Sequence, residues 1–400
     1  MLTSLALIFL VGLSMAAICQ QLKIPRIIGM LATGIVLGPH VLNLLDSSIL
    51  GISSELRQMA LIIILIKAGL ALDIADLKKV GRPALLMSFL PAIFEIIAVV
   101  LLAPVFLGVT RLEAAIIGAV LGAVSPAVVV PKMVSLMETH YGTDKSIPQL
   151  ILAGASLDDV FVIVIFSTFV RMEQGGSATM MDFINIPVSI LLGILLGAIV
   201  GWMLAIFFET AYAHKHLIRN SMKVIIILGT AFLLMAIETW VEPWISVSGL
   251  LAVMSMACAV QMKSTKKVAT RLSAKYGKLW LAAEVILFVL VGAAVDIRYT
   301  LNAGLMSLLV ILLALILRSI GVFFCMIGTN LNTKERLFCM IAYLPKATVQ
   351  AAIGSVPLSL GLPCGMIVLS IAVLSIIITA PLGAFGMDLT YKKFLTKESQ

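Results

Sequence analysis

Two adjacent carboxylates, Asp158 and Asp159, lie inside the apolar stretch AGASLDDVFVIVIF at residues 153–166. No neighbour in the sequence neutralises them. A carboxylate at the centre of a bilayer costs about 2.5–3.5 kcal/mol on insertion scales, and two such charges also repel each other. A proton removes this cost, and so does a small cation. The pair therefore favours a site for which a proton and a monovalent cation compete.

Adjacent residues of a helix project about 100° apart, so the two carboxylates can have different roles. We expect Asp159 to carry the ion and Asp158 to be more structural. The alternative is that both are tied to basic residues within apolar segments, namely Lys346, Arg318 or Lys67, and only hold helices together. Lys67 is assigned no role beyond a possible charge in a cytoplasmic cavity.

The composition decides what kind of element must position these residues. Of the 400 residues, 61% are hydrophobic and 12% are charged. This balance excludes an ordinary soluble domain and indicates an all-α polytopic membrane protein, because the apolar runs lack the alternation of barrel strands. The apolar runs predict thirteen transmembrane helices, with spans at 2–19, 27–45, 57–72, 84–107, 112–136, 147–171, 184–209, 221–241, 244–262, 279–297, 303–328, 335–360 and 364–387.

Basic residues set the predicted orientation. Of 28 Lys and Arg, 21 fall in the odd-numbered connections and the C-terminal tail, and four fall on the other side. Positive charge marks the cytoplasmic side, so the N-terminus is expected outside a cell membrane and the C-terminus in the cytoplasm. The net charge of +8 follows from this bias, and no nucleic-acid partner is implied.

A weak internal repeat divides the chain. IKAGLALDIADL at 66–77 resembles VLVGAAVDIRYTL at 289–301, which aligns Asp73 with Asp296 at an offset of 223. The first copy runs into Lys78, Lys79 and Arg82, whereas the second runs into Arg298 alone, so the copies are expected to be inverted relative to each other. One integral membrane unit, 1–400, would contain a first repeat at 1–171, a linker helix at 184–209 and a second repeat at 221–387.

The same offset relates Glu95 to Arg318, each in the middle of a span. Opposite charges at equivalent depths of symmetry-related helices are well placed to pair. The alternative is that each lines a cavity or reaches the interface separately.

Two spans carry helix-breaking residues near their middle: LGAVSPAVVVP at 121–131 and YLPKATVQAAIG at 343–354. Pro126 and Pro345 each remove an amide donor and leave carbonyls free, which is tolerated at membrane depth only beside protein or water. The offset also relates Ser125 to Thr348, so the breaks correspond. Each half-helix end brings a partial charge, and Lys346 could neutralise a negative one. A transport site is expected here.

The segments IPRIIGMLATGIVLGP, IKAGLALDIADLKK, GAVSPAVVVPKM, GASLDDV and LPKATVQAAIGSVPL together resemble the monovalent cation:proton antiporter superfamily, and most closely the sodium/proton antiporter (NHA) group of its second branch. The resemblance implies a homodimer and elevator-like alternating access. It also implies a core of spans 4–6 and 11–13 in which two broken helices cross beside the ion site.

The resemblance also implies roles for particular residues. Asp158 and Asp159 match the aspartate pair of the family, the second being the principal carrier. Ser125 and Pro126 match the first unwound segment, Lys346 lies beside the second, and Glu95 with Arg318 match a core ion pair. Many electrogenic relatives place a lysine near VLVGAAVDI to partner the first aspartate, and this chain has none there. Arg318 is a candidate substitute, which leaves the exchange stoichiometry open.

The predicted function is secondary antiport of Na⁺ or Li⁺ against H⁺, serving pH homeostasis. We expect no enzyme activity and no cofactor, and no P-loop is present to bind ATP. A sodium-coupled symporter of an organic anion on the same architecture is the alternative. An intramembrane aspartyl protease is disfavoured, because its carboxylates lie on different helices and require a GxGD motif.

Overall fold

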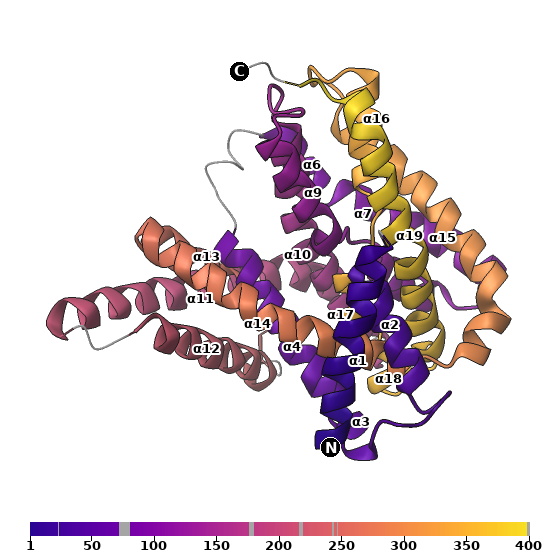
Figure 1. Cartoon of the computed structure of the whole chain (residues 1–400), viewed down its shortest axis with the longest axis horizontal. Helices are drawn as coiled ribbons and strands as arrows, with labels where there is room; N and C mark the ends of the chain where they lie inside the picture. The colour runs from indigo at the N-terminus through magenta and orange to yellow at the C-terminus, as the bar shows by residue number, and fades with distance from the viewer. Residues whose placement is uncertain are drawn as a thin grey trace. The chain divides into compact units, whose positions relative to one another are not determined.

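The computed structural model describes residues 1–22, 24–71, 81–175, 180–215, 219–241, 244–245 and 247–397 (Figure 1). Helices make up nearly all regular structure in these ranges, and an isolated β-bridge joins Tyr141 to Lys397. Asp73, Lys78 and Lys79, which carry the first copy of the predicted repeat, lie outside the described residues.

The helices of the N-terminal part are α1 (Leu2–Gln21), α2 (Arg26–Leu37), α3 (Ser47–Gly51), α4 (Ser53–Ala71), α6 (Arg82–Met87), α7 (Leu90–Leu107), α8 (Arg111–Leu121), α9 (Pro126–Glu138) and α10 (Ile147–Glu173). Those that follow are α11 (Met180–Lys215), α12 (Asn220–Val241), α13 (Gly249–Lys263), α14 (Lys266–Ala293), α15 (Ile297–Cys325), α16 (Thr333–Ala342), α17 (Thr348–Ile353), α18 (Val356–Ser359) and α19 (Gly365–Phe394).

Every one of the thirteen predicted spans overlaps a helix or a broken helix. By length and composition, seven helical segments in the described ranges can cross a membrane: Leu2–Gln21, Arg82–Leu107, Leu191–Thr210, Ser221–Val241, Val268–Ala293, Gly304–Cys325 and Gly365–Phe394. Arg26–Leu37 and Gly249–Lys263 are apolar but shorter. The chain is therefore a polytopic helical membrane protein, and the full count of thirteen stays a prediction.

Two predicted span boundaries differ most from the observed helix ends. The second span was predicted to reach residue 45, but α2 ends at Leu37, where Gly38 takes an extended conformation with φ −69° and ψ 174°. The tenth was predicted to start at 279, but α14 starts at Lys266. Lys and Arg favour helix, so the polar residues before the apolar run extend it beyond the segment that hydropathy detects.

The chain forms two compact units. The first, unit 1, contains Met1–Ser54, Asp73–Gly176 and Leu287–Gln400, and the second, unit 2, contains Glu55–Leu72 and Ser177–Ile286. In unit 2 the predicted linker helix lies within α11 and packs closely on α13 through Gly193, Gly197 and Gly201. A Cβ added at Gly197 would lie 2.1 Å from the carbonyl oxygen of Ala252. Small residues spaced by four thus allow the two backbones to approach.

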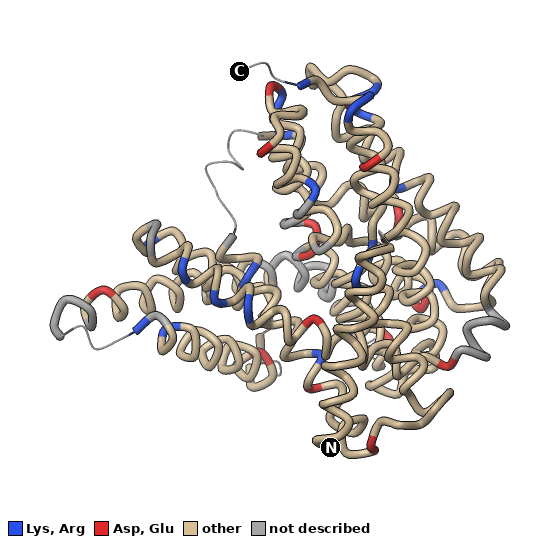
Figure 2. Tube along the Cα trace, in the orientation of Figure 1, with Lys and Arg blue, Asp and Glu red and all other residues tan. Residues whose placement is uncertain are grey.

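Unit 1 holds all the candidate site residues. Its helices pack α7 along α15 and against α8, α10 against α8 and α9, and α19 against α15 and α16. Charged residues are sparse along these helices (Figure 2). The unit therefore surrounds its few buried charges with apolar side chains, and each charge needs a specific partner.

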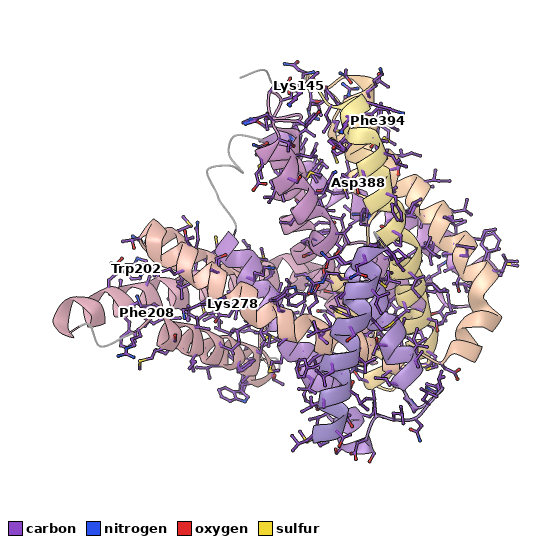
Figure 3. All side chains as sticks on the ribbon, viewed as in Figure 1. Lys145, Trp202, Phe208, Lys278, Asp388 and Phe394 are labelled. Atoms are coloured by element: carbon purple, nitrogen blue, oxygen red, sulfur yellow. The ribbon has the colours of Figure 1, made fainter. Side chains whose placement is uncertain are left out.

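One end of unit 1 is closed by the last turn of α19 and the residues after it. The amide of Gly142 donates to the carbonyl of Thr396 at 2.8 Å, and the rings of Tyr141 and Tyr391 meet edge to face at 5.2 Å. Figure 3 shows Lys145 and Phe394 at this end, and the Nζ of Lys145 lies 2.9 Å from the carboxylate of Glu335. The connection between α9 and α10 is thus fixed to the C-terminal segment.

Candidate ion-binding site

The first break separates α8 from α9. A capping box between Thr110 and Glu113 starts α8, and the helix ends at Leu121. Residues 122–125 are not helical, and α9 starts with Pro126 at its first position, where the missing amide costs nothing. The last carbonyls of α8 and the first amides of α9 therefore need partners from elsewhere.

The second break separates α16 from α17. A capping box between Asn332 and Glu335 starts α16, which ends at Ala342. Residues 343–347 are not helical, and α17 starts at Thr348. Pro345 and Lys346 lie within this break, as the sequence predicted.

The two breaks lie against each other. The amide of Ser125 donates to the carbonyl of Pro345 at 2.8 Å, and the hydroxyl oxygens of Ser125 and Thr348 are 3.4 Å apart. Ser125 and Thr348 are both buried. The residues that the repeat offset relates are thus in contact.

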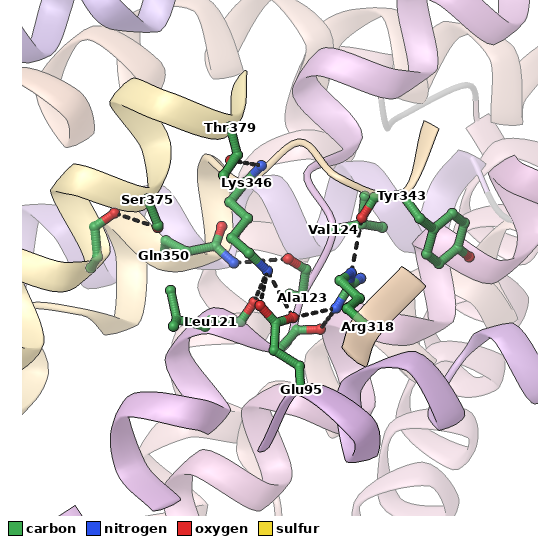
Figure 4. A network of polar contacts seen from close by, with 12 residues as sticks. Glu95, Leu121, Ala123, Val124, Arg318, Tyr343, Lys346, Gln350, Ser375 and Thr379 are labelled. Carbon is green, nitrogen blue, oxygen red and sulfur yellow. Dashed lines mark hydrogen bonds and ion pairs between the residues drawn. The ribbon is translucent and has the colours of Figure 1, made fainter. Parts of the chain in front are cut away.

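Three side chains bind the free carbonyls at the end of α8 (Figure 4). The Nζ of Lys346 donates to Leu121 and the Nη1 of Arg318 donates to Gly122. The Nε2 of Gln350 donates to Ala123 at 2.9 Å. The C-terminal end of a helix carries partial negative charge, so two cations and an amide are suited to it. The expected contact of Lys346 with a negative helix end is present.

Glu95 is fully buried on α7 and contacts both cations. Its Oε2 accepts from the Nη1 of Arg318 at 2.8 Å, and the Nζ of Lys346 lies 2.7 Å from its Oε1. The predicted contact between Glu95 and Arg318 is therefore present, and Lys346 shares the same carboxylate. Neither Glu95 nor Arg318 reaches solvent separately, because both are 0% exposed.

Asp158 lies on α10, and its carboxylate accepts hydrogen bonds from the first break and from Arg318. Its Oδ2 accepts from the amide of Val124 at 2.8 Å and from the Nη2 of Arg318 at 3.1 Å. The Nε of Arg318 donates to the carbonyl of Tyr343 at 2.9 Å. One guanidinium thus links α7, α10 and both breaks, which its fork of donors allows.

Asp159 differs from its neighbour. It is 7% exposed, and its Oδ1 is buried without a hydrogen-bond partner. No ion pair joins it to a basic residue in the described part of the chain. Lys67, which sequence reasoning left as a possible partner of the pair, belongs to unit 2, where its Nζ lies 6.0 Å from the centre of the Trp280 ring.

Sequence reasoning missed three residues of this network, two of which act through their side chains and one through its backbone carbonyl. Gln350 accepts from the amide of Ala347 at 2.8 Å as well as donating to the first break, and Thr379 accepts from the amide of Lys346 at 2.9 Å. Tyr343 provides the carbonyl that binds Arg318. A neutral polar residue inside an apolar span was the available signal, and Gln350 is the plainest case.

Comparison with known proteins agrees with this arrangement. A family model described as "Sodium/hydrogen exchanger, transmembrane" matches residues 5–389. The chain belongs to the sodium/hydrogen exchanger family. The resemblance of its motifs to monovalent cation:proton antiporters is thereby confirmed.

Curated members of the sodium/hydrogen exchanger family are similar over most of this chain. The human protein "Sodium/hydrogen exchanger 9B2" is 34% identical over 355 residues, and the alignment covers 86% of this chain and 65% of that protein. The human "Sodium/hydrogen exchanger 9B1" is 31% identical over 360 residues, with 86% and 67% covered. The chain thus spans about two thirds of the length of these relatives.

A solved structure has the same fold as this chain. The sodium proton antiporter MjNhaP1 from Methanocaldococcus jannaschii at pH 8 superposes with a TM-score of 0.84 at 21% identity, covering 98% of each chain. At this identity the likeness establishes the fold alone. The polytopic antiporter fold predicted from the sequence is therefore correct.

Proposed function

We propose that this chain exchanges Na⁺ or Li⁺ for H⁺ across a cell membrane, with Asp159 as the carrier and no cofactor. The proposal is supported above all by the unequal partners of the two aspartates. Asp158 is bound by Arg318 and by a backbone amide, whereas the buried Oδ1 of Asp159 has no hydrogen-bond partner in the described residues. Family membership supports the same assignment.

The charge balance of the buried cluster explains why one ion is needed. Glu95, Asp158 and Asp159 contribute three negative charges, and Arg318 and Lys346 contribute two positive ones. One proton or one monovalent cation on Asp159 makes the cluster neutral. A second positive charge would face Arg318 in a medium of low dielectric constant, where like charges repel strongly. Cation and proton therefore compete for one position.

The correspondence between the two breaks supports alternating access. Glu95 contacts Arg318 and Ser125 contacts Thr348, and both pairs are separated by 223 residues. Residues related by an inverted repeat meet in this way when they lie near the axis that relates the repeats. We therefore infer two inverted six-helix repeats joined by the linker helix, with the charged cluster near their axis. Elevator-like movement of the core would expose this cluster to each side in turn.

The topology and the assembly belong to the same proposal. The distribution of Lys and Arg supports an N-terminus outside and a C-terminus in the cytoplasm. We infer thirteen spans in a homodimer embedded in the lipid bilayer. Single cysteines introduced at positions 2 and 396 should react with a membrane-impermeant maleimide on opposite sides of the membrane; labelling from one side would contradict the odd number of spans.

The proposed function is tested with the purified chain in proteoliposomes that contain a pH-sensitive dye. A sodium or lithium gradient should move protons across the wild-type membrane, and Asp159→Asn should abolish this movement. Asp388→Asn is the matched control, because Asp388 is 62% exposed and pairs with Lys132 away from the cluster. Exchange by Asp159→Asn at the wild-type rate would refute the carrier assignment. Sodium uptake without any pH change in the wild type would instead favour a symporter.

A further inference from the structure

The hydroxyl of Tyr343 is a buried polar group that the site described above does not use. The Tyr343 side chain is 0% exposed, and its hydroxyl has no hydrogen-bond partner among the described residues. A buried donor without an acceptor costs on the order of 1–3 kcal/mol. A phenylalanine would fill the same space without this cost, so the hydroxyl is expected to have a function.

The hydroxyl lies against the helix that carries the acidic pair. A Cβ added at Gly154 of α10 would lie 2.0 Å from the Tyr343 hydroxyl oxygen, so the space at Gly154 is the space that this oxygen needs. Asp158 follows Gly154 by four residues and thus lies on the same face, one turn later. Side chains of a helix lean toward its N-terminus, which directs the Asp158 carboxylate toward the turn at Gly154.

A second buried polar atom without a partner is found on the same side chain. Oδ2 of Asp158 accepts two hydrogen bonds, whereas its Oδ1 has none in the described residues. A donor without an acceptor and an acceptor without a donor are therefore one helical turn apart on one face of α10.

Arg318 fixes Tyr343 and Asp158 to the same group. Its Nε donates to the carbonyl of Tyr343 at 2.9 Å, its Nη2 donates to Asp158 at 3.1 Å, and its central carbon lies 5.7 Å from the centre of the Tyr343 ring. Any movement that preserves these contacts keeps the phenol and the carboxylate close to each other.

We propose that Tyr343 is a positioning residue for the acidic pair: its hydroxyl donates a hydrogen bond to Oδ1 of Asp158, directly or through one water molecule, during the transport cycle. The bond stabilises the charged form of Asp158, and a charged Asp158 sets how firmly its neighbour Asp159 holds a proton. This inference rests on the proposed function, because it assigns Tyr343 a part in the same exchange.

Several other groups act on the pair and must be held constant. Arg318 and Lys346 supply positive charge, and Glu95 and Asp159 supply negative charge. The thiols of Cys325 on α15 and Cys339 on α16 are the remaining titratable groups that interact with the Tyr343 ring. A test must therefore remove the hydroxyl alone and leave all six groups in place.

Tyr343→Phe is that test. Without this donor the negative charge of Asp158 is less well neutralised, so it repels the charged form of Asp159 more strongly. Asp159 then holds its proton more tightly and releases it at higher pH. The pH of half-maximal sodium-driven exchange should rise by less than about one unit, because one unit is the effect of a hydrogen bond on the carboxylate that accepts it and Asp159 senses the loss only through Asp158. At a fixed pH below this midpoint, the sodium concentration for half-maximal exchange should rise several-fold while the maximal rate changes less.

Tyr276→Phe is the matched control. The Tyr276 side chain is also 0% exposed, but it lies in unit 2, where its hydroxyl donates to the carbonyl of Val224 at 2.9 Å. This variant should lower the melting temperature and leave the pH midpoint unchanged. Tyr343→Phe could instead raise the melting temperature and change neither the pH midpoint nor the sodium dependence. The Tyr343 hydroxyl would then only destabilise the fold, and the inference would be wrong.

Gly154→Ala provides a second, independent readout. The added methyl group would displace the Tyr343 hydroxyl. In Tyr343→Phe it would still lie 2.9 Å from the Cβ of Met87 and 3.2 Å from the end of the ring, so the rescue can only be partial. Gly154→Ala should therefore reduce exchange, and adding Tyr343→Phe should restore part of the rate with the midpoint of Tyr343→Phe. No restoration would contradict the contact. A wild-type protein without any sodium-dependent proton movement would overturn the proposed function and this inference together, whereas normal wild-type exchange with an unchanged Tyr343→Phe overturns only the inference.

Discussion

The Nη2 of Arg318 lies 3.1 Å from the Oδ2 of Asp158, and neither side chain is exposed. Arg318 is therefore the basic partner of the first aspartate, in the role that electrogenic relatives were expected to give to a lysine of the preceding span. The replacement of a lysine by an arginine matters chemically, because a guanidinium stays protonated whereas a buried ammonium can lose its proton. Arg318 can hold Asp158 without taking part in proton transfer.

The first prediction concerns the stoichiometry. If Arg318 and Lys346 keep their charges while Asp158 stays paired, only Asp159 changes its occupant, and one cation moves for each proton. Exchange in proteoliposomes should then be electroneutral, with the same rate when the membrane voltage is clamped at 0 and at about −100 mV, a voltage worth about 2.3 kcal/mol per charge. An exchange rate that depends on the membrane voltage would show that more than one proton moves for each cation. Lys346 would then be the candidate carrier of the additional proton.

The second prediction concerns the contact between Glu95 and Arg318. From the sequence alone, exchanging the two charges should rescue either single reversal, because only one partner of each is foreseen. The structure gives the opposite expectation, since Arg318 also donates to Asp158 and to the carbonyls of Gly122 and Tyr343. A glutamate at 318 would face these acceptors without a donor.

Glu95→Arg combined with Arg318→Glu should therefore remain as unstable as the single reversals, each of which should cost on the order of 3–5 kcal/mol. Melting temperatures in detergent measure this directly. The control is the swap of Lys132 and Asp388, an ion pair whose carboxylate is 62% exposed and for which the swap should restore wild-type stability. Full recovery of the buried double variant would mean that Glu95 is the only important partner of Arg318.

The third prediction concerns Gln350, which links the two breaks through Ala123 and Ala347. Gln350→Leu leaves a carbonyl and an amide unpaired, at about 1–3 kcal/mol each, and should lower both the melting temperature and the exchange rate. Gln149→Leu is the matched control, because the Oε1 of Gln149 is buried without a partner in the described residues. Its removal should change stability by less than about 1 kcal/mol. Equal effects of the two substitutions would show that the bridge between the breaks is unimportant.

The sequence predicts the parts of this site that have a cost in lipid. The sequence points to Asp158, Glu95, Arg318 and Lys346 because a charge inside an apolar span needs a partner, and the offset of 223 relates Glu95 to Arg318. Pro126 and Pro345 are visible because proline cannot donate to a helix. The costs of a buried charge and of a proline inside a helix depend on the residue and its neighbours in the sequence, so they can be recognised from one sequence without an alignment.

Other features depend on how distant segments meet, and the sequence could not supply them. Gln350 is a neutral residue whose importance lies in two backbone groups of different breaks. The division into unit 1 and unit 2 interleaves three segments with two, and no local pattern marks such a division. The end of α2 at Leu37 could not be located from hydropathy because residues 38–45 are mostly apolar without being helical.

The fourth prediction tests the close packing of α11 on α13 within unit 2. Gly197→Ala would bring a methyl carbon to 2.1 Å from the Ala252 carbonyl oxygen, so the helices must separate or shift. A cost of about 1–3 kcal/mol is expected, the range for overpacking a well-packed interior. Gly229→Ala on α12 is the matched control, because no atom lies within 4 Å of a Cβ added there. Alanine favours helix over glycine by about 0.8–1.0 kcal/mol, so this control should be neutral or stabilising. The melting temperatures of both variants in detergent measure this difference. If Gly197→Ala is as stable as Gly229→Ala, α11 and α13 are not held at this distance.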